Sequence, residues 1–428
     1  MKIAILGFGC EGKAILKYLK NSAQYKNADI SILDKKIDKN YLLNLNNFNI
    51  IFRSPGVPYN LPEIKNAIKK GVIFSSSTDL FFKNAKKIGC KIIGITGTKG
   101  KGTTATLLYK ILKADKKDVH LVGNIGKPAV EILPKLDKKS VVIFELSSFQ
   151  LQDLKYSPDI AVILNIFEDH LDSHKNFKEY IEAKANIAKW QKKSDKIFYD
   201  ADNKWSHWVV KKSISQKFPV LIENLKLFNI EKIKMLGVHN LKNAVMAAMV
   251  AKNLEIKKNI IKKVIKNFKG MEHRLELVHS NVFENVGINF YNDSASTNPY
   301  TAVAAIKSFK EPNVLIAGGK DKGLDYTPLA NALKNSNTKL IILFGENKKK
   351  IVKVISKIKN KEFKIIEAND LKSAVNLAHK TAKSLATGAV APHPLIAVLF
   401  SPASASFDMF KDYKDRGKKF KEIVKGLK

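Results

Sequence analysis

The segment GITGTKGKGTTATLL, residues 94–108, combines the residue types that bind phosphate groups. Its glycines let backbone N–H groups approach phosphate oxygens, the N-terminus of a following helix adds a favourable dipole, and Lys101 adds a positive charge. The spacing departs from the common G-x-x-x-x-G-K-[ST] loop: Gly102 follows the lysine, so the hydroxyl that usually ligates Mg²⁺ comes one position later, at Thr103. A purely structural glycine-rich turn is the alternative, but the apolar segment before the loop and the helical pattern after it favour nucleotide binding.

Two other apolar segments are followed by side chains that can bind a metal ion. In VVIFELSSFQ, residues 141–150, Glu145 ends the apolar segment, and in IAVILNIFEDH, residues 160–170, His170 follows another. Ligands collect at the carboxyl ends of parallel strands, so these residues could hold Mg²⁺ opposite the phosphate loop. Histidine is not the usual ligand of this hard ion, and a lone glutamate after a strand is more often a helix cap or an ion-pair partner.

A second glycine-rich turn, GFGCEG at residues 7–12, follows the first apolar segment of the chain. Asp34 ends the next apolar segment, 22 residues beyond Gly12. This arrangement is the fingerprint of a dinucleotide-binding turn, so an NAD-dependent oxidoreductase is one interpretation. The same geometry would bind the diphosphate of a UDP compound at a helix N-terminus, and a tight structural turn is the third interpretation.

Short apolar segments alternate with amphipathic ones along almost the whole chain. KIAILGFG, CKIIGITG and NVLIAGG read as strands, whereas TATLLYKILKAD and NAVMAAMVAKNLEI read as helices. This alternation predicts an α/β fold with parallel sheets and helical crossovers. We expect three domains, at residues 1–88, 89–274 and 275–428.

The composition is that of a strongly basic globular protein. Among 428 residues there are 75 lysines and arginines against 39 acidic residues, which gives a formal net charge of +36. The lysines are spread along the chain without a nucleic-acid-binding motif, so we expect a lysine-rich surface and no nucleic-acid partner. Two distant cysteines, the lack of a signal peptide and the lack of a membrane-length apolar segment predict a cytoplasmic protein without membrane insertion.

Further motifs occur in one order along nearly the entire chain: ITGTKGKGTT, GNIG, ELSSFQL, NIFEDHLDSH, GVHNLKNAVMA, EHR, NDSASTNP, GGKDKG and LFSPASASFDMFKDYKDRGKKF. Together they resemble the Mur ligases, and most of all the members of that family that add D-glutamate. The resemblance implies an N-terminal Rossmann-like domain for a UDP substrate, a central P-loop ATPase domain with a mostly parallel sheet, and a C-terminal Rossmann-like domain for an amino acid. It also implies that ATP phosphorylates the carboxylate of UDP-N-acetylmuramoyl-L-alanine and that the amine of D-glutamate attacks the acyl phosphate, a step of peptidoglycan precursor synthesis. We expect a monomer.

The resemblance also implies the residues that bind each substrate. ATP would be bound by Thr98, Lys99, Gly100, Lys101, Gly102, Thr103, Thr104, Asn240, Asn243, Arg274 and Asp293. The UDP substrate would be bound by Gly7, Gly9, Gly12, Asp34, Ser54, Gly56 and Asn124. D-Glutamate would be bound by Thr297, Lys322, Ser406, Phe407 and Tyr413.

For the metal site the resemblance implies two Mg²⁺ ions, bound by Glu145, His170, Thr103 and Lys184. Lys184 matches a lysine that the family carries as an anionic carbamate. The residues implied in catalysis are Lys101, Lys184, His170 and Lys322. Without the resemblance, Lys184 would be one lysine among many on a lysine-rich helix.

Two departures from the family pattern keep alternatives open. Gly102 gives a G-K-G-T loop like that of folylpolyglutamate synthase, and Ala295 stands where the family has a lysine. A folylpolyglutamate synthase-like ligase, or a Mur ligase with another acceptor, is therefore an alternative, although the N-terminal UDP-type domain opposes the former. A non-catalytic nucleotide- or nucleic-acid-binding protein is a third possibility, which the retained Lys101, Glu145, His170 and Lys184 oppose.

Overall fold

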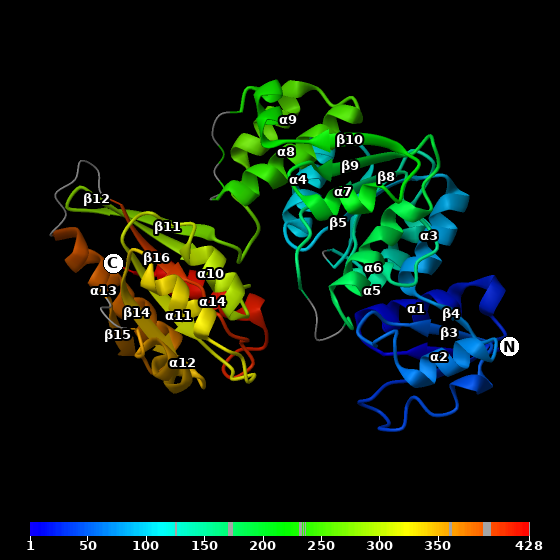
Figure 1. Ribbon diagram of the computed structural model, residues 1–428, viewed down its shortest axis with the longest axis horizontal. Helices are drawn as coiled ribbons and strands as arrows, with labels where there is room; N and C mark the ends of the chain where they lie inside the picture. Colours follow the sequence, from blue (N-terminus) through cyan, green and yellow to red (C-terminus); the bar gives the residue numbers. More distant parts are fainter. Residues whose placement is uncertain are drawn as a thin grey trace. The chain divides into compact units, whose positions relative to one another are not determined.

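The computed structural model describes residues 1–124, 126–169, 174–230, 233, 235, 237–358, 362–387 and 395–427. These residues form three sheets with flanking helices, which confirms the predicted α/β class (Figure 1). The chain folds into two compact units, one made of Met1–Ile233 and Val238–Phe268, the other of Lys234–Gly237 and Lys269–Lys428. The first unit contains two of the sheets and the second contains one.

The N-terminal sheet of the first unit has four parallel strands in the order β2-β1-β3-β4. Four of the five side chains of the central strand β1 are buried, as expected for a strand covered on both faces. The strands are β1 (Lys2–Leu6), β2 (Asp29–Leu33), β3 (Ile50–Arg53) and β4 (Ile73–Ser75). The helices are α1 (Cys10–Asn21), η1 (Ala23–Tyr25), η2 (Leu45–Asn47), α2 (Pro62–Lys69) and α3 (Ser77–Ile88).

The central sheet of the same unit has six parallel strands in the order β10-β9-β8-β5-β7-β6. Its strands are β5 (Lys91–Thr96), β6 (Val119–Gly123), β7 (Val141–Glu145), β8 (Ile160–Ile163), β9 (Lys196–Asp200) and β10 (Gln216–Val220). Its helices are α4 (Lys101–Ala114), η3 (Ala129–Lys135), α5 (Ser148–Leu151), α6 (Phe177–Lys189), α7 (Lys204–Val210), η4 (Ile222–Phe228), α8 (Val238–Asn253) and α9 (Lys258–Asn267). Because β5 lies between β7 and β8, the segments that follow all three strands meet at one edge of the sheet.

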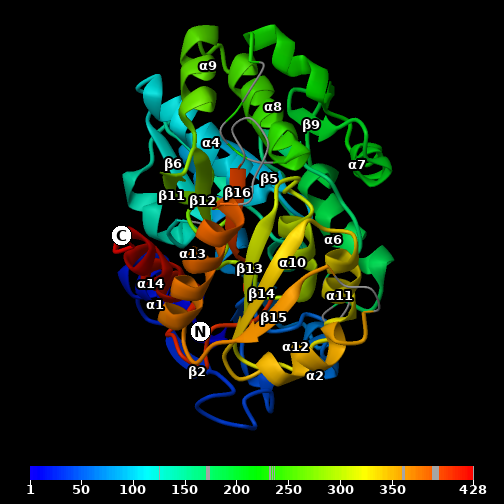
Figure 2. The same cartoon turned by 90° about the vertical axis from the view of Figure 1, so that its left-hand side faces the viewer.

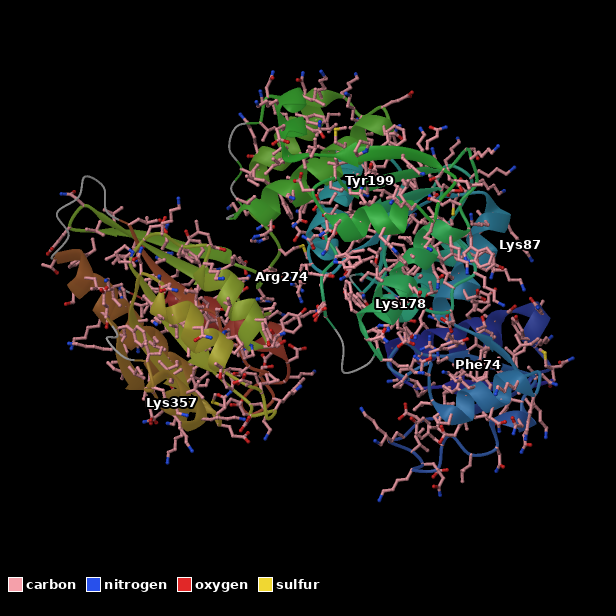
Figure 3. All side chains as sticks on the ribbon, viewed as in Figure 1. Phe74, Lys87, Lys178, Tyr199, Arg274 and Lys357 are labelled. Atoms are coloured by element: carbon pink, nitrogen blue, oxygen red, sulfur yellow. The ribbon has the colours of Figure 1, made fainter. Side chains whose placement is uncertain are left out.

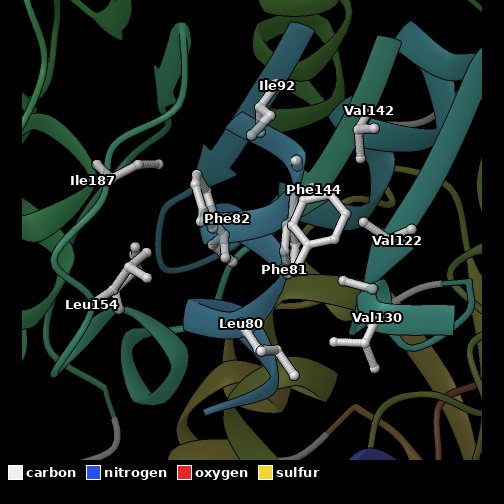
Figure 4. Packing of buried hydrophobic residues seen from close by; sticks show 14 of the residues in the cluster. Leu80, Phe81, Phe82, Ile92, Val122, Val130, Val142, Phe144, Leu154 and Ile187 are labelled. Atoms are coloured by element: carbon white, nitrogen blue, oxygen red, sulfur yellow. The ribbon is translucent and has the colours of Figure 1, made fainter. Parts of the chain in front are cut away.

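One hydrophobic core joins the two sheets of the first unit. Phe82 of α3 stacks on Phe144 of β7 with ring centroids 5.8 Å apart, and Phe81 meets the same ring edge-on at 5.4 Å (Figure 4). The cluster also contains Ile3 and Ile5 of the N-terminal sheet. Helix α3, which ends at the predicted domain boundary, therefore packs against the sheet that follows it in the chain.

The sheet of the second unit is mixed and has the order β11-β12-β16-β13-β14-β15, with β11 antiparallel to β12 and the other pairs parallel. Its strands are β11 (Glu276–Phe283), β12 (Val286–Asn292), β13 (Asn313–Gly318), β14 (Thr338–Phe344), β15 (Lys364–Glu367) and β16 (Leu395–Phe400). Its helices are α10 (Pro299–Ile306), α11 (Thr327–Lys334), α12 (Lys348–Ile355), α13 (Leu371–Thr387) and α14 (Tyr413–Lys425). Alternate side chains of the strands pack against α13 and α14 on one face and against α10, α11 and α12 on the other, as in a doubly wound fold. Figure 2 shows these helices flanking the sheet.

Lysine side chains are distributed over both units. Lys87 of α3, Lys178 of α6 and Lys357, two residues after α12, are all exposed (Figure 3). Among the described residues, no helix combines the length and the apolar character needed to cross a bilayer.

Candidate active site

The glycine-rich loop that is expected to bind phosphate connects β5 to α4, as the sequence predicts. Gly97 has φ of 155° and Gly100 has φ of 86°, backbone conformations that favour glycine. A Cβ atom on Gly97 would lie 2.6 Å from the Cβ of Leu164, and one on Gly100 would collide with the Asn243 amide. Glycine is therefore required at both positions, and α4 starts directly after the loop with the N–H groups of its first turn available to an anion.

Two lysines lie against this loop from different helices. The ammonium group of Lys101, at the start of α4, donates to the carbonyls of Gly97 at 3.0 Å and Thr98 at 3.1 Å. The ammonium group of Lys184, on α6, donates to the same Gly97 carbonyl at 2.9 Å and lies 4.6 Å from the ring centroid of Tyr180. The structure thus brings together two residues that are 83 positions apart in the chain.

Lys184 has an unusual environment for a lysine. Only 1% of the residue is exposed, and its neighbours on the helix include Tyr180, Ile181 and Ile187, all buried. Burial lowers the pKa of Lys184 well below its ordinary value, and the positive charge of Lys101 lowers it further. A lysine with a depressed pKa has a larger fraction of neutral amine near neutral pH than a surface lysine has.

The segment that follows β8 is fixed to the loop by several polar contacts. Thr98 Oγ1 bonds with the backbone N–H and C=O of Phe167 at 3.1 and 3.0 Å and lies 3.0 Å from the Tyr180 hydroxyl. Lys99 forms an ion pair with Asp169 at 3.0 Å. These contacts hold residues 165–169 beside the loop, whereas the predicted ligand His170 lies outside the described residues.

Glu145 reaches the same edge of the sheet from the other side of β5. It is buried at the end of β7 and is paired in register with Ile95, two residues before the loop begins. Thr103 lies in the first turn of α4 and is partly exposed. Within the described ranges no three His, Cys, Asp or Glu side chains converge as a preformed metal site.

Helix α8 supplies the third side of the loop. Asn243 accepts a hydrogen bond from the Thr104 hydroxyl at 3.4 Å and donates to Asn240 at 3.3 Å. A hollow next to the loop is lined by Asn165, Asn243 and Met246 together with the Lys242–Asp200 ion pair, whose charged atoms are 3.3 Å apart. The family resemblance assigned Asn240 and Asn243 to the ATP site, whereas Asp200 was not singled out, although its position at the end of β9 follows the strand-end rule applied to Glu145.

The N-terminal glycine turn brings most of its predicted residues together. The backbone N–H of Phe8 donates to Asp34 at 2.6 Å, a bond that is the main cause of the lowered pKa of Asp34. The Ser54 hydroxyl donates to the Gly7 carbonyl at 2.6 Å, and a Cβ on Gly12 would collide with that same carbonyl. Gly9 precedes α1 as its N-cap.

The two remaining residues predicted for the UDP substrate are both exposed. A Cβ atom on Gly56 would meet no other atom within 4 Å, so steric crowding does not explain why glycine occupies this position. Asn124 directly follows β6, at the edge of the central sheet.

In the second unit, two motifs meet at the carboxyl ends of β13 and β16. The backbone N–H of Lys320 donates to the Ala405 carbonyl at 2.9 Å, which joins GGKDKG to SPASASF. The ammonium group of Lys322 then lies 5.1 Å from the ring centroid of Phe407, a cation–π contact. Ser406, which lies between Ala405 and Phe407 in the chain, is buried, whereas Phe407 is 62% exposed.

A buried arginine that the sequence analysis did not single out holds these loops together. The guanidinium group of Arg416 donates to the Ser294 hydroxyl at 3.1 Å and carbonyl at 2.9 Å, to the Ser404 carbonyl at 2.9 Å and to the Ala405 carbonyl at 3.1 Å. The Ser294 hydroxyl in turn donates to the Tyr413 carbonyl at 2.8 Å. The segments that carry Thr297, Ser406 and Tyr413 are thereby connected, and burial lowers the pKa of Arg416 to about 10.

Arg274 and Asp293 are neighbours in the second unit. Asp293 accepts hydrogen bonds from the backbone N–H of Leu275 at 3.2 Å and from the Ser401 hydroxyl at 2.7 Å. Burial raises the pKa of Asp293 to about 7, since it outweighs these hydrogen bonds. Arg274, directly before Leu275, is exposed (Figure 3).

Comparison with known proteins gives matches over the whole chain. The family profile for the Mur ligase middle domain matches residues 95–251, and the profile for the Mur ligase glutamate ligase domain matches residues 273–392. The UDP-N-acetylmuramoylalanine--D-glutamate ligase of Acetivibrio thermocellus is 33% identical over 472 residues, which covers all of this chain and 96% of that protein. The ligase of the same name from Clostridium tetani is 34% identical over 466 residues, with 100% and 97% covered.

Solved structures share the fold at much lower identity. UDP-N-acetylmuramate-alanine ligase MurC from Thermotoga maritima has a TM-score of 0.57 and 16% identity, with 100% of both chains covered. Mycobacterium tuberculosis folylpolyglutamate synthase complexed with ADP has a TM-score of 0.58 and 13% identity, with 82% of this chain and 94% of that chain covered.

Proposed function

This chain belongs to the Mur ligase family, as its motifs predict, and from that premise we propose that it is an ATP-dependent ligase that joins D-glutamate to UDP-N-acetylmuramoyl-L-alanine. The observation that carries the proposal is the match of 33–34% identity, over the full length of the chain, to ligases of that name. The γ-phosphoryl group of ATP would pass to the substrate carboxylate, leaving ADP. The amine of D-glutamate would then attack the acyl phosphate, so that an amide bond forms, phosphate leaves and the amine loses a proton.

We infer that residues 97–103, which form the loop and the first turn of α4 and include Lys101, bind the phosphates of ATP. Both the carboxylate and the γ-phosphate are anions, so their approach needs positive charge in fixed positions. Lys101 donates hydrogen bonds to two carbonyls of the loop. The N-terminus of α4, the positive end of the helix dipole, also lies at this loop. Asn240 and Asn243, packed beside the loop, are our candidates for contacts to the nucleoside.

We infer that Lys184 reacts with CO₂ to form a carbamate. The reaction joins the neutral amine nitrogen to the carbon of CO₂ and releases one proton, so it is favoured by the depressed pKa of this lysine. The product is an anion next to Lys101, which converts a repulsive pair of cations at the Gly97 carbonyl into an attractive pair.

Glu145 and Thr103 offer the carboxylate and hydroxyl oxygens that Mg²⁺ prefers, so the described residues fit the proposed ion. We propose that they hold Mg²⁺ together with the Lys184 carbamate and His170, and that two ions bind. Mg²⁺ would supply positive charge that stabilises the transferring phosphoryl group.

For D-glutamate we propose the cluster at the ends of β13 and β16. Lys322 would bind a carboxylate, the hydroxyls of Thr297 and Ser406 would donate hydrogen bonds, and Phe407 and Tyr413 would form an apolar wall. Arg416 connects three of the four segments involved, which supports their acting as one site. We propose that Arg274 and Asp293, in the same unit, contact ATP.

The glycine turn with Asp34 and Ser54 is our candidate site for the UDP group, together with the exposed Gly56 and Asn124. A folylpolyglutamate synthase remains the second candidate because its fold matches and because of the G-K-G-T loop. The full-length identity to D-glutamate ligases, which includes this N-terminal turn, favours the first. We place the reaction in the cytoplasm, where ATP is available and where Cys10 and Cys90 would stay as free thiols.

The test is phosphate release with ATP and UDP-N-acetylmuramoyl-L-alanine while the amino acid is varied. We expect rapid release with D-glutamate and little with L-glutamate, L-lysine or diaminopimelate, because the amine must face the acyl phosphate while both carboxylates are held. Equal turnover with one of the other three would overturn the choice of acceptor. Turnover that requires a folate in place of the UDP compound would favour the second candidate.

A further inference from the structure

Arg53 connects the N-terminal sheet to the central domain within the first unit. It ends β3, immediately before the SPGVP segment of residues 54–58, and only 1% of it is exposed. Its guanidinium group donates to the Val57 carbonyl at 2.7 Å, to the Asp153 carboxylate at 3.1 Å and to the Phe149 carbonyl at 3.3 Å. One buried side chain therefore connects the segment that carries Ser54 and Gly56 to helix α5 and the residues after it.

Two further polar contacts join the same regions. Gln150 of α5 donates to Glu11, in the first turn of α1, at 3.0 Å. Asn60, shortly after the SPGVP segment, donates to Glu179 of α6. The central-domain partners lie on α5, which starts three residues after Glu145, and on α6, which carries Lys184. The proposed UDP site is thus linked to the helices next to the proposed metal site.

A contribution to folding stability does not by itself explain why a buried arginine occupies position 53. Burying an ion pair costs desolvation that the attraction roughly offsets, and apolar side chains of similar volume are often as stabilising. The side chains of Arg53 and Asp153 are 2% and 13% exposed, so this cost applies here. What the planar guanidinium adds is geometry, because its fixed fork of donors reaches several acceptors at once.

We propose that Arg53 is a positioning residue, which sets the UDP-binding segment at a fixed distance from the phosphate loop so that the carboxylate of the bound substrate meets the γ-phosphate. The inference rests on the proposed function, because it needs one substrate to reach from the glycine turn to the loop. Small displacements between reacting groups are costly in enzymes, on the order of a hundredfold in rate for about 1 Å. Changes at Arg53 are therefore expected to alter the KM for the UDP substrate and kcat, and to leave the KM for ATP unchanged.

The experiment compares Arg53→Lys and Asp153→Ala with the unmodified protein, by kcat, by the KM for each substrate and by the Tm. Lysine keeps the charge but cannot reach all three acceptors. We expect Arg53→Lys to lower kcat about tenfold or more and to raise the KM for the UDP substrate, with an unchanged KM for ATP. Asp153→Ala removes one acceptor and should shift the same two constants by a smaller factor, which tests the proposal even if Arg53→Lys folds poorly.

Lys196→Met is the matched control, because Lys196 also links distant segments of the first unit, through Asn253 at 3.1 Å, but from the amino end of β9. It should change none of the kinetic constants. A fall in Tm with unchanged kcat and KM in both Arg53→Lys and Asp153→Ala would overturn the proposal, as would a change confined to the KM for ATP. If the unmodified protein is inactive with D-glutamate, the proposed function fails, whereas an active protein with unaffected variants refutes only the role of Arg53.

Discussion

The two glycine turns of the first unit, residues 7–12 and 97–103, share a backbone plan but differ in their surroundings. Each connects a buried parallel strand to a helix. In the N-terminal turn, Gly12 packs on the carbonyl of Gly7 within the turn itself, and Gly7 packs on Ser54 and Val57 of the segment that follows β3. In the central loop, Gly97 packs on Leu164 and Gly100 packs on the Asn243 amide of α8.

The charges near the two turns differ as well. Carboxylates lie at the N-terminal turn, where Asp34 accepts from the turn itself and Glu11 from Gln150. Three lysines lie at the central loop: Lys99, which pairs with Asp169, and Lys101 and Lys184, which both donate to the Gly97 carbonyl. Under the proposed assignment, a glycine turn would provide the place for phosphate in both cases, and the added cations would distinguish the turn that transfers a phosphoryl group from the one that holds a substrate.

The largest effect is expected from the cation of the central loop. Lys101→Ala should lower the rate of phosphate release by at least about 10²–10³-fold, because the variant loses a charge that stabilises the transferring phosphoryl group. Circular dichroism should show an unchanged fold. Lys13→Met, which removes the exposed lysine after the N-terminal turn, is the matched control and should keep its kcat. Similar losses in both variants would erase the distinction between the turns.

Lys184→Ala should reduce turnover by roughly 10–100-fold, since its carbamate is inferred to support the metal site. Acetate should restore part of the activity by replacing the carbamate. The unmodified protein should lose activity when bicarbonate is removed and when the pH is lowered, because protonation of the amine prevents carbamate formation. Lys189→Ala, on the same helix, is the control, and a fully active Lys184→Ala variant would show that this lysine has only a packing role.

A smaller effect is expected from the N-terminal turn. Gly12→Ala forces a Cβ against the Gly7 carbonyl, and such overpacking costs about 1–3 kcal/mol. Where the turn relieves this by shifting away from the bound substrate, each 1.4 kcal/mol or so of the cost corresponds to about a tenfold loss of binding. The KM for the UDP substrate should rise by about that factor while the KM for ATP stays constant. Gly426→Ala, where a Cβ would make only ordinary contacts, should change neither. A rise in the KM for ATP would contradict the separate roles of the two turns.

Local patterns predicted the strands, the turns and the position of Glu145, because periodicity and strand ends are encoded by neighbouring residues. The position of Lys184 came only from family resemblance, although it occupies the same helix face as Tyr180, Ile181 and Ile187. A lysine within the apolar face of a helix could therefore have indicated from the sequence that this side chain is buried. The roles of Arg53 and Arg416 could not be read locally, since their partners are up to 100 and 122 residues away in the chain.

The packing of Phe81 and Phe82 on Phe144 has a consequence for how this chain can be divided. A fragment cut at residue 88 would separate these rings, exposing apolar surface on both pieces. The two sheets of the first unit should accordingly unfold together as one cooperative block. The second unit has its own hydrophobic core on both faces of its sheet, so it should be able to fold independently. Chimeras between relatives should therefore be tolerated far better when the segments are joined near residue 268 than at residue 88. The N-terminal sheet is in this sense a structural part of the central domain and not a separate module.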